Sequence, residues 1–214
     1  MKKEWEIKTL GEVCDVINGL WTGKTPPYIN VGVIRNTNFT KDCKLNDDDI
    51  AYLDVEIKQY QKRKLQYGDL IIEKSGGGPK QPVGRAIIFN KQEGEFSFSN
   101  FTSALRINKE IVDFRFVHKV LLYKYLNGET EKMQSHTIGI RNLDFKLYKE
   151  ISIPIPPIKE QEEIVEKLDK GFELIDSLKE TAKKNLDNAK ELFQSVLREE
   201  LPIVTGKQIG RAHV

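Results

Sequence analysis

Cysteine and histidine are scarce in this sequence of 214 residues. The two cysteines, Cys14 and Cys43, form no CxxC pair, and the three histidines do not stand near them at the spacing of metal ligands. A disulfide framework or a zinc site needs such patterns. We therefore expect two buried or half-buried thiols, and neither a metal nor a cofactor.

A long apolar run is also missing. No stretch approaches the roughly 20 apolar residues of a membrane helix, and the first residues, MKKEWEIKTLGEV, lack the apolar core of a signal peptide. Hydrophobic residues make up 39% of the chain and charged residues 31%, which suits a soluble globular protein. The sequence predicts a cytoplasmic protein without a membrane segment.

The chain has little net charge, only +2, but the charge is unevenly divided. Residues 1–157 contain 24 Lys and Arg against 20 Asp and Glu, whereas residues 158–201 contain 8 against 12. The first part is net basic by 4 and the second part is net acidic by 4. The basic part is therefore the candidate for contact with phosphate, and the acidic part for contact with protein.

Complete catalytic motifs are absent as well. Gly19 and Gly23 precede Lys24, but this loop is one residue shorter than the P-loop whose backbone amides wrap phosphates. Pro26-Pro27-Tyr28 is similar to a methyltransferase motif, yet Thr25 is a poor substitute for its first residue, and no glycine-rich cofactor loop accompanies it. No Ser-His-Asp or Cys-His set is legible. The sequence predicts a protein without a catalytic centre.

Short β-rich runs between Gly, Pro, Asn and Asp fill the first part of the chain. These runs are VCDVING, YINVGVI, GDLIIEK, VGRAIIFN, FSFSNFTSALRIN and KEISIPI. A helix is expected in DFRFVHKVLLYKYL, before a stop at Asn127-Gly128. Its predicted apolar face consists of Phe116, Val120, Leu121, Tyr123 and Leu126. The predicted fold class is α+β, with a strand-rich core and long loops over residues 1–157.

A proline cluster at residues 154–157 marks the expected boundary, because prolines are excluded from a helix interior. Residues 158–201 contain no proline and repeat apolar residues in alternating steps of four and three, which predicts one long coiled-coil helix. The predicted dimer face consists of Ile164, Leu168, Ile175, Leu178, Ala182, Ala189, Leu192 and Val196. A helix of about 60 Å cannot bury such a stripe against a small domain, so a partner helix is favoured over a solvated surface helix. Residues 202–214 are interpreted as a disordered tail or an appended, non-native segment.

Four polar segments of the first part carry side chains that suit DNA. They are residues 35–38, 73–85, 97–103 and 135–142, which are all expected to be loops for most of their length. Three successive glycines, at 76–78, let a backbone approach another molecule closely. Arg and Asn pair bidentately with guanine and adenine edges. From the residues alone, the 73–85 segment fits a flexible surface hairpin as well as a DNA contact. The 35–38 and 97–103 segments are more typical of turns, and the 135–142 segment also fits a purely structural loop.

Four motifs carry a resemblance to a known family. The sequence IPIPPIKEQEEIV at 153–165 combines an aliphatic-proline entry with Glu-Gln and an aliphatic pair at the start of a long helix. WEIKTLGEV at 5–13, GDLII at 68–72 and GIRNL at 139–143 echo the same family. Over about residues 4–200 the chain resembles the specificity subunits of type I restriction-modification systems.

The resemblance implies a target-recognition domain whose loops enter DNA grooves, and a helix that pairs antiparallel with a second helix. It also implies binding to methyltransferase subunits, which methylate adenine, and through them to restriction subunits. A full subunit has two recognition domains and two helices, whereas this chain has one of each. It is either a natural half-subunit or a fragment.

With this resemblance the polar segments are interpreted as DNA contacts. The predicted DNA-binding residues are Lys24, Arg35, Asn36, Lys74, Ser75, Lys80, Gln81, Arg85, Asn100, His136 and Arg141. Five of them, Arg35, Lys74, Gln81, Asn100 and Arg141, are expected on one DNA-facing surface. The expected assembly is a homodimer through antiparallel 158–201 helices, which would read an interrupted palindrome. The competing hypotheses are a coiled-coil scaffold without DNA binding and a divergent DNA methyltransferase.

Overall fold

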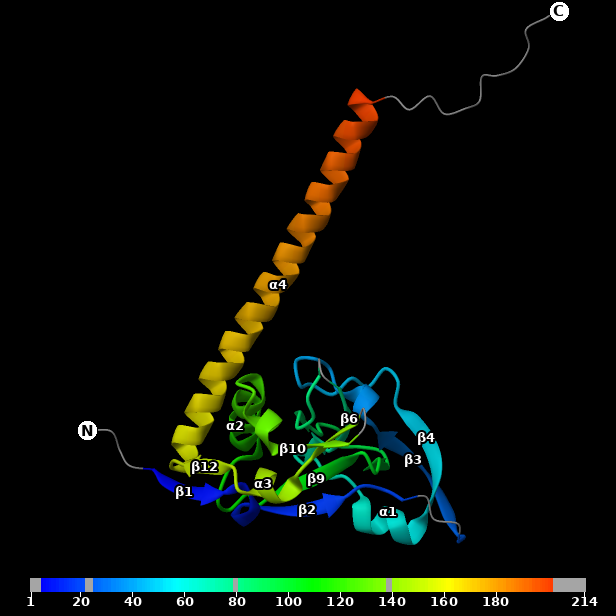
Figure 1. The fold of residues 1–214 in the computed structure, drawn as a ribbon, viewed down its shortest axis with the longest axis vertical. Coiled ribbons are helices and arrows are strands. Elements are labelled where there is room, and N and C mark those ends of the chain that lie inside the picture. The colour runs from blue at the N-terminus through cyan, green and yellow to red at the C-terminus, as the bar shows by residue number, and fades with distance from the viewer. Residues whose placement is uncertain (1–4, 22–24, 79–80, 138–139, 202–214) are drawn as a thin grey trace, which may run out of the picture. The chain divides into compact units, whose positions relative to one another are not determined.

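The computed structural model describes residues 5–21, 25–78, 81–137 and 140–201 (Figure 1). The chain divides into two compact units, residues 1–165 and residues 166–214. The strands of the first unit are β1 (Glu6–Thr9), β2 (Cys14–Asn18), β3 (Tyr28–Ile34), β4 (Ala51–Glu56), β5 (Leu70–Glu73), β6 (Ser75–Gly77), β7 (Ala86–Ile88), β8 (Phe96–Phe98), β9 (Thr102–Ile107), β10 (Gln134–Thr137), β11 (Ile140–Leu143) and β12 (Ser152–Ile155). The helices are α1 (Ile57–Arg63), α2 (Phe114–Leu126), α3 (Phe145–Lys149) and α4 (Ile158–Glu200). The predicted α+β class, with a strand-rich domain and a long C-terminal helix, is confirmed.

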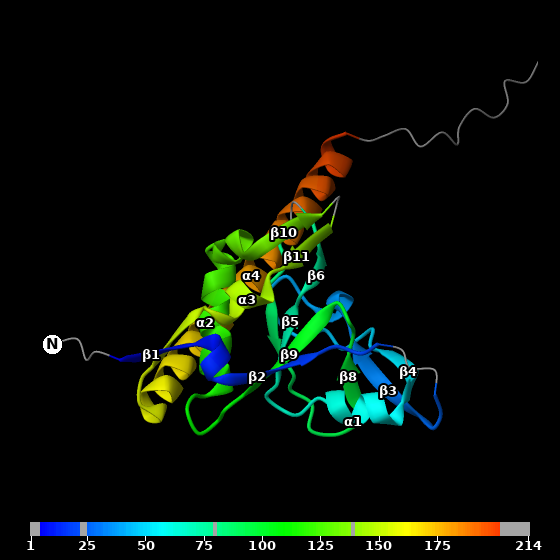
Figure 2. The same ribbon diagram turned by 60° about the horizontal axis from the view of Figure 1, so that its bottom comes forward.

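A four-stranded antiparallel sheet in the order β2-β9-β5-β7 forms the centre of the first unit. Successive side chains of a strand point to opposite faces, so Leu70 and Ile72 enter one core and Ile71 enters another. Helix α2 covers the first face, and the sheet β4-β3-β8 lies on the second (Figure 2). Because β5 is buried on both faces, it reads as a continuous apolar run in the sequence.

The sequence interpretation of α2 was right about the helix and wrong about part of its buried face. Asp113 caps the helix by accepting from the backbone amides of Arg115 and Phe116, and Gly128 follows it in the left-handed conformation. Phe116 and Leu121 are buried as expected, but Tyr123 and Leu126 are exposed. Val117, His118 and Leu122 are buried in their place. The helical periodicity is compatible with two apolar faces, and packing against the central sheet determines which of them is buried.

Two segments that were expected to be continuous or irregular are organised differently. The run at 96–108 is split by a turn into β8, which pairs parallel with β3, and β9, which joins the central sheet. The described residues of the predicted loop at 135–142 lie in strands, because β10 pairs antiparallel with β11. Strands β1 and β12 also pair, so the beginning and the end of the first unit lie side by side (Figure 1).

The first turns of α4 belong to the first unit. Val165 is fully buried in the main core, and Ile164 packs against the same cluster. Gln161 is also buried: its Nε2 donates to the carbonyl of Pro156 at 2.7 Å, and its Oε1 accepts from the Asp113 amide at 2.8 Å. The glutamine of the Glu-Gln motif therefore joins the start of α4 to the start of α2.

The second unit consists of the rest of α4, among the residues that the structure describes. Most of its apolar side chains are exposed, with Leu178 at 59% and Leu192 at 66%. Lys179 and Asp176, and likewise Lys190 and Asp187, lie 3.7 Å apart as exposed pairs one turn apart. Such pairs contribute little to stability. Ile164 packs in the first unit, so the exposed part of the predicted dimer face begins at Leu168.

The two thiols are free, and burial raises the pKa of Cys14 to about 12 and of Cys43 to about 11. Neither thiol is therefore a thiolate near neutral pH. Within the described ranges, no helix is both long and apolar enough to cross a membrane.

Candidate nucleic-acid interface

Strand β6 brings the glycine-rich segment to the 135–142 segment. In the β6–β11 pair, Gly77 lies opposite Arg141 and Ser75 lies opposite Asn142, with a register shift between the two. The Ser75 hydroxyl also donates a hydrogen bond to the Asn142 side-chain oxygen. Two of the four predicted DNA-contacting segments thus share one small sheet.

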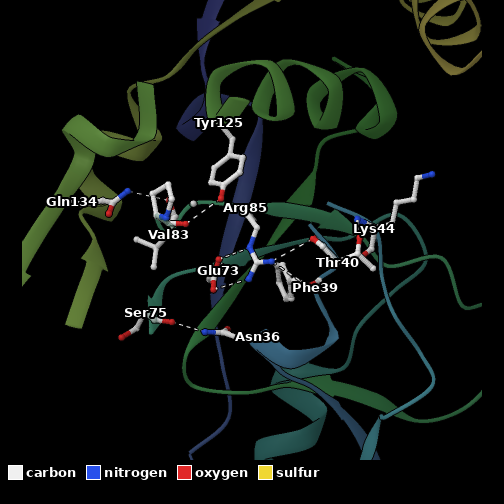
Figure 3. A network of polar contacts seen from close by, with 12 residues as sticks. Asn36, Phe39, Thr40, Lys44, Glu73, Ser75, Val83, Arg85, Tyr125 and Gln134 are labelled. Atoms are coloured by element: carbon white, nitrogen blue, oxygen red, sulfur yellow. Dashed lines mark hydrogen bonds and ion pairs between the residues drawn. The ribbon is translucent and has the colours of Figure 1, made fainter. Parts of the chain in front are cut away.

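The 35–38 segment reaches β6 through a side chain. Asn36 Nδ2 donates to the backbone carbonyl of Ser75 (Figure 3). The residue after Ser75 is Gly76, which has a φ of +97°, and a Cβ there would sit 3.0 Å from Asn36 Nδ2. The neighbouring Arg35 donates through Nη2 to the Asp49 carbonyl at 3.1 Å, and its guanidinium is 3.4 Å from the Asp49 carboxylate. Asn36 therefore contacts the glycine-rich segment directly, and Arg35 is its neighbour in the sequence.

The turn between β8 and β9 supplies the fourth segment. The carbonyl of Phe101 accepts from the backbone amides of Lys74 at 2.9 Å and Ser75 at 3.1 Å. This places Asn100 next in sequence to a residue bonded to β6. Burial lowers the pKa of Lys74, which is half-buried. A nearby phosphate would favour the charged ammonium and offset that effect.

The three glycines have different roles. A Cβ on Gly77 would lie 2.7 Å from Val83 Cγ1 and 2.8 Å from the Gln81 carbonyl, so this glycine is needed for packing within the chain. Gly78 exchanges two backbone hydrogen bonds with Gln81, of 2.9 and 3.1 Å, and a Cβ on it would meet nothing within 4 Å. Gln81 itself is exposed. The close approach expected of this segment is thus partly an intramolecular one.

Arg85 corrects one of the predicted DNA contacts. Its side chain is 4% exposed and forms a bidentate ion pair with Glu73, which is 1% exposed (Figure 3). Burial lowers the pKa of Arg85, and the Glu73 carboxylate reverses this, so that the pKa is raised overall. A guanidinium whose donors are used inside the protein does not face a base or a phosphate. Its position in a basic, glycine-rich segment suggested the surface, but the partner on β5 was not visible in the sequence.

Three further predictions fall partly or wholly outside the described residues. Lys24 and Lys80 lie outside them. His136 is in β10 and its backbone pairs with Arg141, but its side chain is not among the described ones.

The segments gathered at β6 offer hydrogen-bond donors and acceptors from seven predicted side chains. These side chains are Arg35, Asn36, Lys74, Ser75, Gln81, Asn100 and Arg141. Buried Arg85 and the positions outside the described residues are left out. Asn142 joins the group through its hydrogen bond with Ser75. Arg, Asn and Gln read base edges, and Lys neutralises phosphate. Asn142 lies in one of the polar segments but was not among the predicted DNA-binding residues, because its hydrogen bond with Ser75 is visible only in the folded chain. Within the described ranges, no group of three or more His, Cys, Asp or Glu is placed to hold a metal ion.

Comparison with known proteins defines the class of this fold and site. The family model of the type I restriction modification DNA specificity domain matches residues 2–188. The chain belongs to this family, which confirms the resemblance drawn from its motifs.

Particular relatives agree with this membership. The chain is similar to the specificity subunit of the type I restriction enzyme EcoKI from Escherichia coli K12, with 29% identity over 90% of this chain and 41% of that subunit. It is 28% identical to the StySPI specificity subunit of Salmonella potsdam, over 90% of this chain and 42% of that one. The chain thus spans about two fifths of the length of these curated relatives.

Solved structures show the same fold. A chain of a type I R-M system, from a study of its complex assembly and conformational transition, matches with a TM-score of 0.68 and 24% identity, over 93% of this chain and 46% of that one. The HsdS subunit of Thermoanaerobacter tengcongensis matches with a TM-score of 0.58 and 21% identity, over 93% and 45%. At these identities the likeness concerns the fold.

Proposed function

We propose that this chain is a DNA-recognition component of a type I restriction-modification system, without a catalytic centre of its own. In this proposal Lys and Arg neutralise phosphates and set the register, while Asn, Gln, Arg and Ser at β6 read base edges. The observation that carries it is the convergence of three predicted segments on β6, which lies in the fourth, through the Asn36–Ser75, Ser75–Asn142 and Lys74–Phe101 hydrogen bonds.

The proposed partners are duplex DNA, methyltransferase subunits and, through them, restriction subunits. We also propose a homodimer through antiparallel α4 helices, because apolar side chains from Leu168 to Val196 are exposed and need a covering surface. The chain covers 46% and 45% of the two solved relatives, so two copies have about the length of one such subunit. A two-fold dimer would read the same half-site on opposite strands.

Selection from a pool of random duplexes tests the proposal. The full chain is expected to enrich one interrupted palindrome and to bind it more weakly as salt rises, because phosphate contacts release counterions. Dimerisation without enrichment of any sequence would favour the coiled-coil scaffold instead.

Alanine substitution at Arg35, Lys74, Gln81, Asn100 or Arg141 should weaken binding to the enriched duplex. A residue that reads a base contributes about 1–3 kcal/mol, and loss of Lys74 should also reduce the salt dependence. Lys62→Ala is the control, because Lys62 is an exposed cation on α1, which lies away from β6 (Figures 1 and 2). Titration of a labelled duplex measures each affinity. Five variants that bind like Lys62→Ala would refute the surface assignment.

The purified chain is expected neither to methylate DNA nor to hydrolyse ATP, because its P-loop and methyltransferase motifs are incomplete. Transfer of labelled methyl groups from S-adenosylmethionine and release of phosphate from ATP measure the two activities. Turnover of either substrate that persists through further purification would contradict the non-catalytic assignment and favour the divergent methyltransferase or an ATPase.

A further inference from the structure

A buried ion pair lies directly behind the candidate interface. Arg85 Nε is 2.7 Å from Glu73 Oε2, and Arg85 Nη2 is 3.0 Å from Glu73 Oε1. Glu73 is the last residue of β5 and immediately precedes Lys74 and Ser75. Arg85 comes just before β7, and its backbone carbonyl accepts from the Glu73 amide at 2.9 Å. The pair therefore closes the base of the glycine-rich segment.

The remaining donor of Arg85 extends this pair to another part of the chain. Its Nη1 donates to the carbonyl of Phe39 at 3.1 Å and to the carbonyl of Thr40 at 3.3 Å, and the guanidinium lies 5.5 Å from the centre of the Phe39 ring (Figure 3). Phe39 and Thr40 follow the 3-10 turn Asn36–Asn38. One guanidinium thus holds the glycine-rich segment and the segment that carries Arg35 and Asn36.

The segment held in this way has unpaired polar atoms. Arg35 Nε and Asn36 Oδ1 are both buried and have no hydrogen-bond partner among the described residues. Buried polar groups are normally paired, so two unpaired atoms on consecutive residues need support from the surrounding structure. The Arg85 donations at Phe39 and Thr40 supply a nearby support.

A buried ion pair is weak evidence for a gain in stability, because desolvation offsets the attraction between its charges. Arg85 differs from Lys in presenting a rigid planar fork of five donors, which is why one residue reaches a carboxylate and two carbonyls together. A Lys at this position keeps the charge and loses the fork. The arrangement therefore favours a role in geometry over a role in stability.

We infer that Arg85 and Glu73 are positioning residues that fix the 35–40 segment against β6 and thereby set base discrimination. The inference rests on the proposed function. This positioning role predicts a result that a purely structural role does not. Loss of the pair relaxes the readout at some base positions and leaves the affinity for unrelated DNA unchanged.

Two variants test this inference. Arg85→Lys keeps the charge, and the double variant Glu73→Met with Arg85→Met removes both charges while it preserves apolar packing, which is often neutral for stability. Arg106→Lys is the matched control. Arg106 forms a bidentate pair of 2.7 and 3.0 Å with buried Asp69 and donates to the Lys64 carbonyl, at the opposite end of β5.

The probes are the duplex enriched by the wild-type chain and a scrambled duplex of equal length. Both variants should lower the ratio of the two affinities by about tenfold, within the range that one base contact provides. Binding to the scrambled duplex and the ratio for Arg106→Lys should change by less than about twofold. Repeated selection with the double variant should give degenerate bases at a subset of positions.

Three results overturn the inference. They are an unchanged ratio in the folded double variant, an equal fall in Arg106→Lys, and a uniform loss of preference at every base position. A wild-type chain that enriches no sequence overturns the proposed function and this inference together, whereas the other three results leave the proposed function intact.

Discussion

Replacing Leu168, Ile175 and Leu178 with glutamate should convert the chain from a dimer into a monomer of 24.6 kDa. These side chains are exposed in α4 and follow the four-three spacing of a coiled-coil seam. Buried like charges without partners would oppose any helix pairing across that seam. Light scattering at micromolar concentration measures the mass, and the wild-type chain should give twice the monomer value.

A control with the same change of charge is available on the opposite side of the helix. Lys170→Gln, Ser177→Glu and Lys184→Gln together make the chain more negative by the same amount, at heptad positions away from the seam. This variant should remain dimeric. A wild-type mass near 24.6 kDa would contradict the homodimer and would favour a fragment that awaits a second half.

Replacing Arg85 alone with methionine should lower the free energy of unfolding of the first unit by about 3–5 kcal/mol. The substitution leaves the Glu73 carboxylate, which is 1% exposed, buried without its ion-pair partner. By contrast Lys64→Met breaks an exposed pair with Glu95 and should destabilise the first unit far less. The double replacement of Glu73 and Arg85 should recover most of the loss.

Denaturation in urea followed by near-ultraviolet circular dichroism measures these differences. All tryptophans and tyrosines precede residue 166, so the signal reports on the first unit and not on the rest of α4. An Arg85→Met variant that unfolds at the same urea concentration as Lys64→Met would show that leaving Glu73 without its ion-pair partner does not destabilise the first unit.

The sequence was sufficient for features that depend on local pattern. The β-rich runs at 28–34 and 68–74 contain β3 and β5, and the apolar periodicity with its Asn127-Gly128 stop placed α2 correctly. Strand β4 was missed because Ala51–Glu56 follows an acidic loop and shows no clear alternation. The β10–β11 strand pair was missed because its polar side chains give no period of two.

The candidate site depended on contacts between distant segments. Arg and Asn in glycine-rich or polar segments indicated the right neighbourhood, and the hydrogen bonds of β6 bring these segments together. Which basic residue is buried could not be read locally, because Arg85 is 12 positions from Glu73 and 46 positions from Phe39. Likewise, Ile164 fits the heptad pattern, but packing assigns it to the first unit.

We propose that this chain selects the DNA sequence at which a methyltransferase acts. Mapping of methylated adenines in a host with and without the gene tests it most directly. The account predicts that one interrupted palindromic motif is methylated when the gene is present and loses its methylation when the gene is removed. An identical set of methylated motifs in both strains would contradict it.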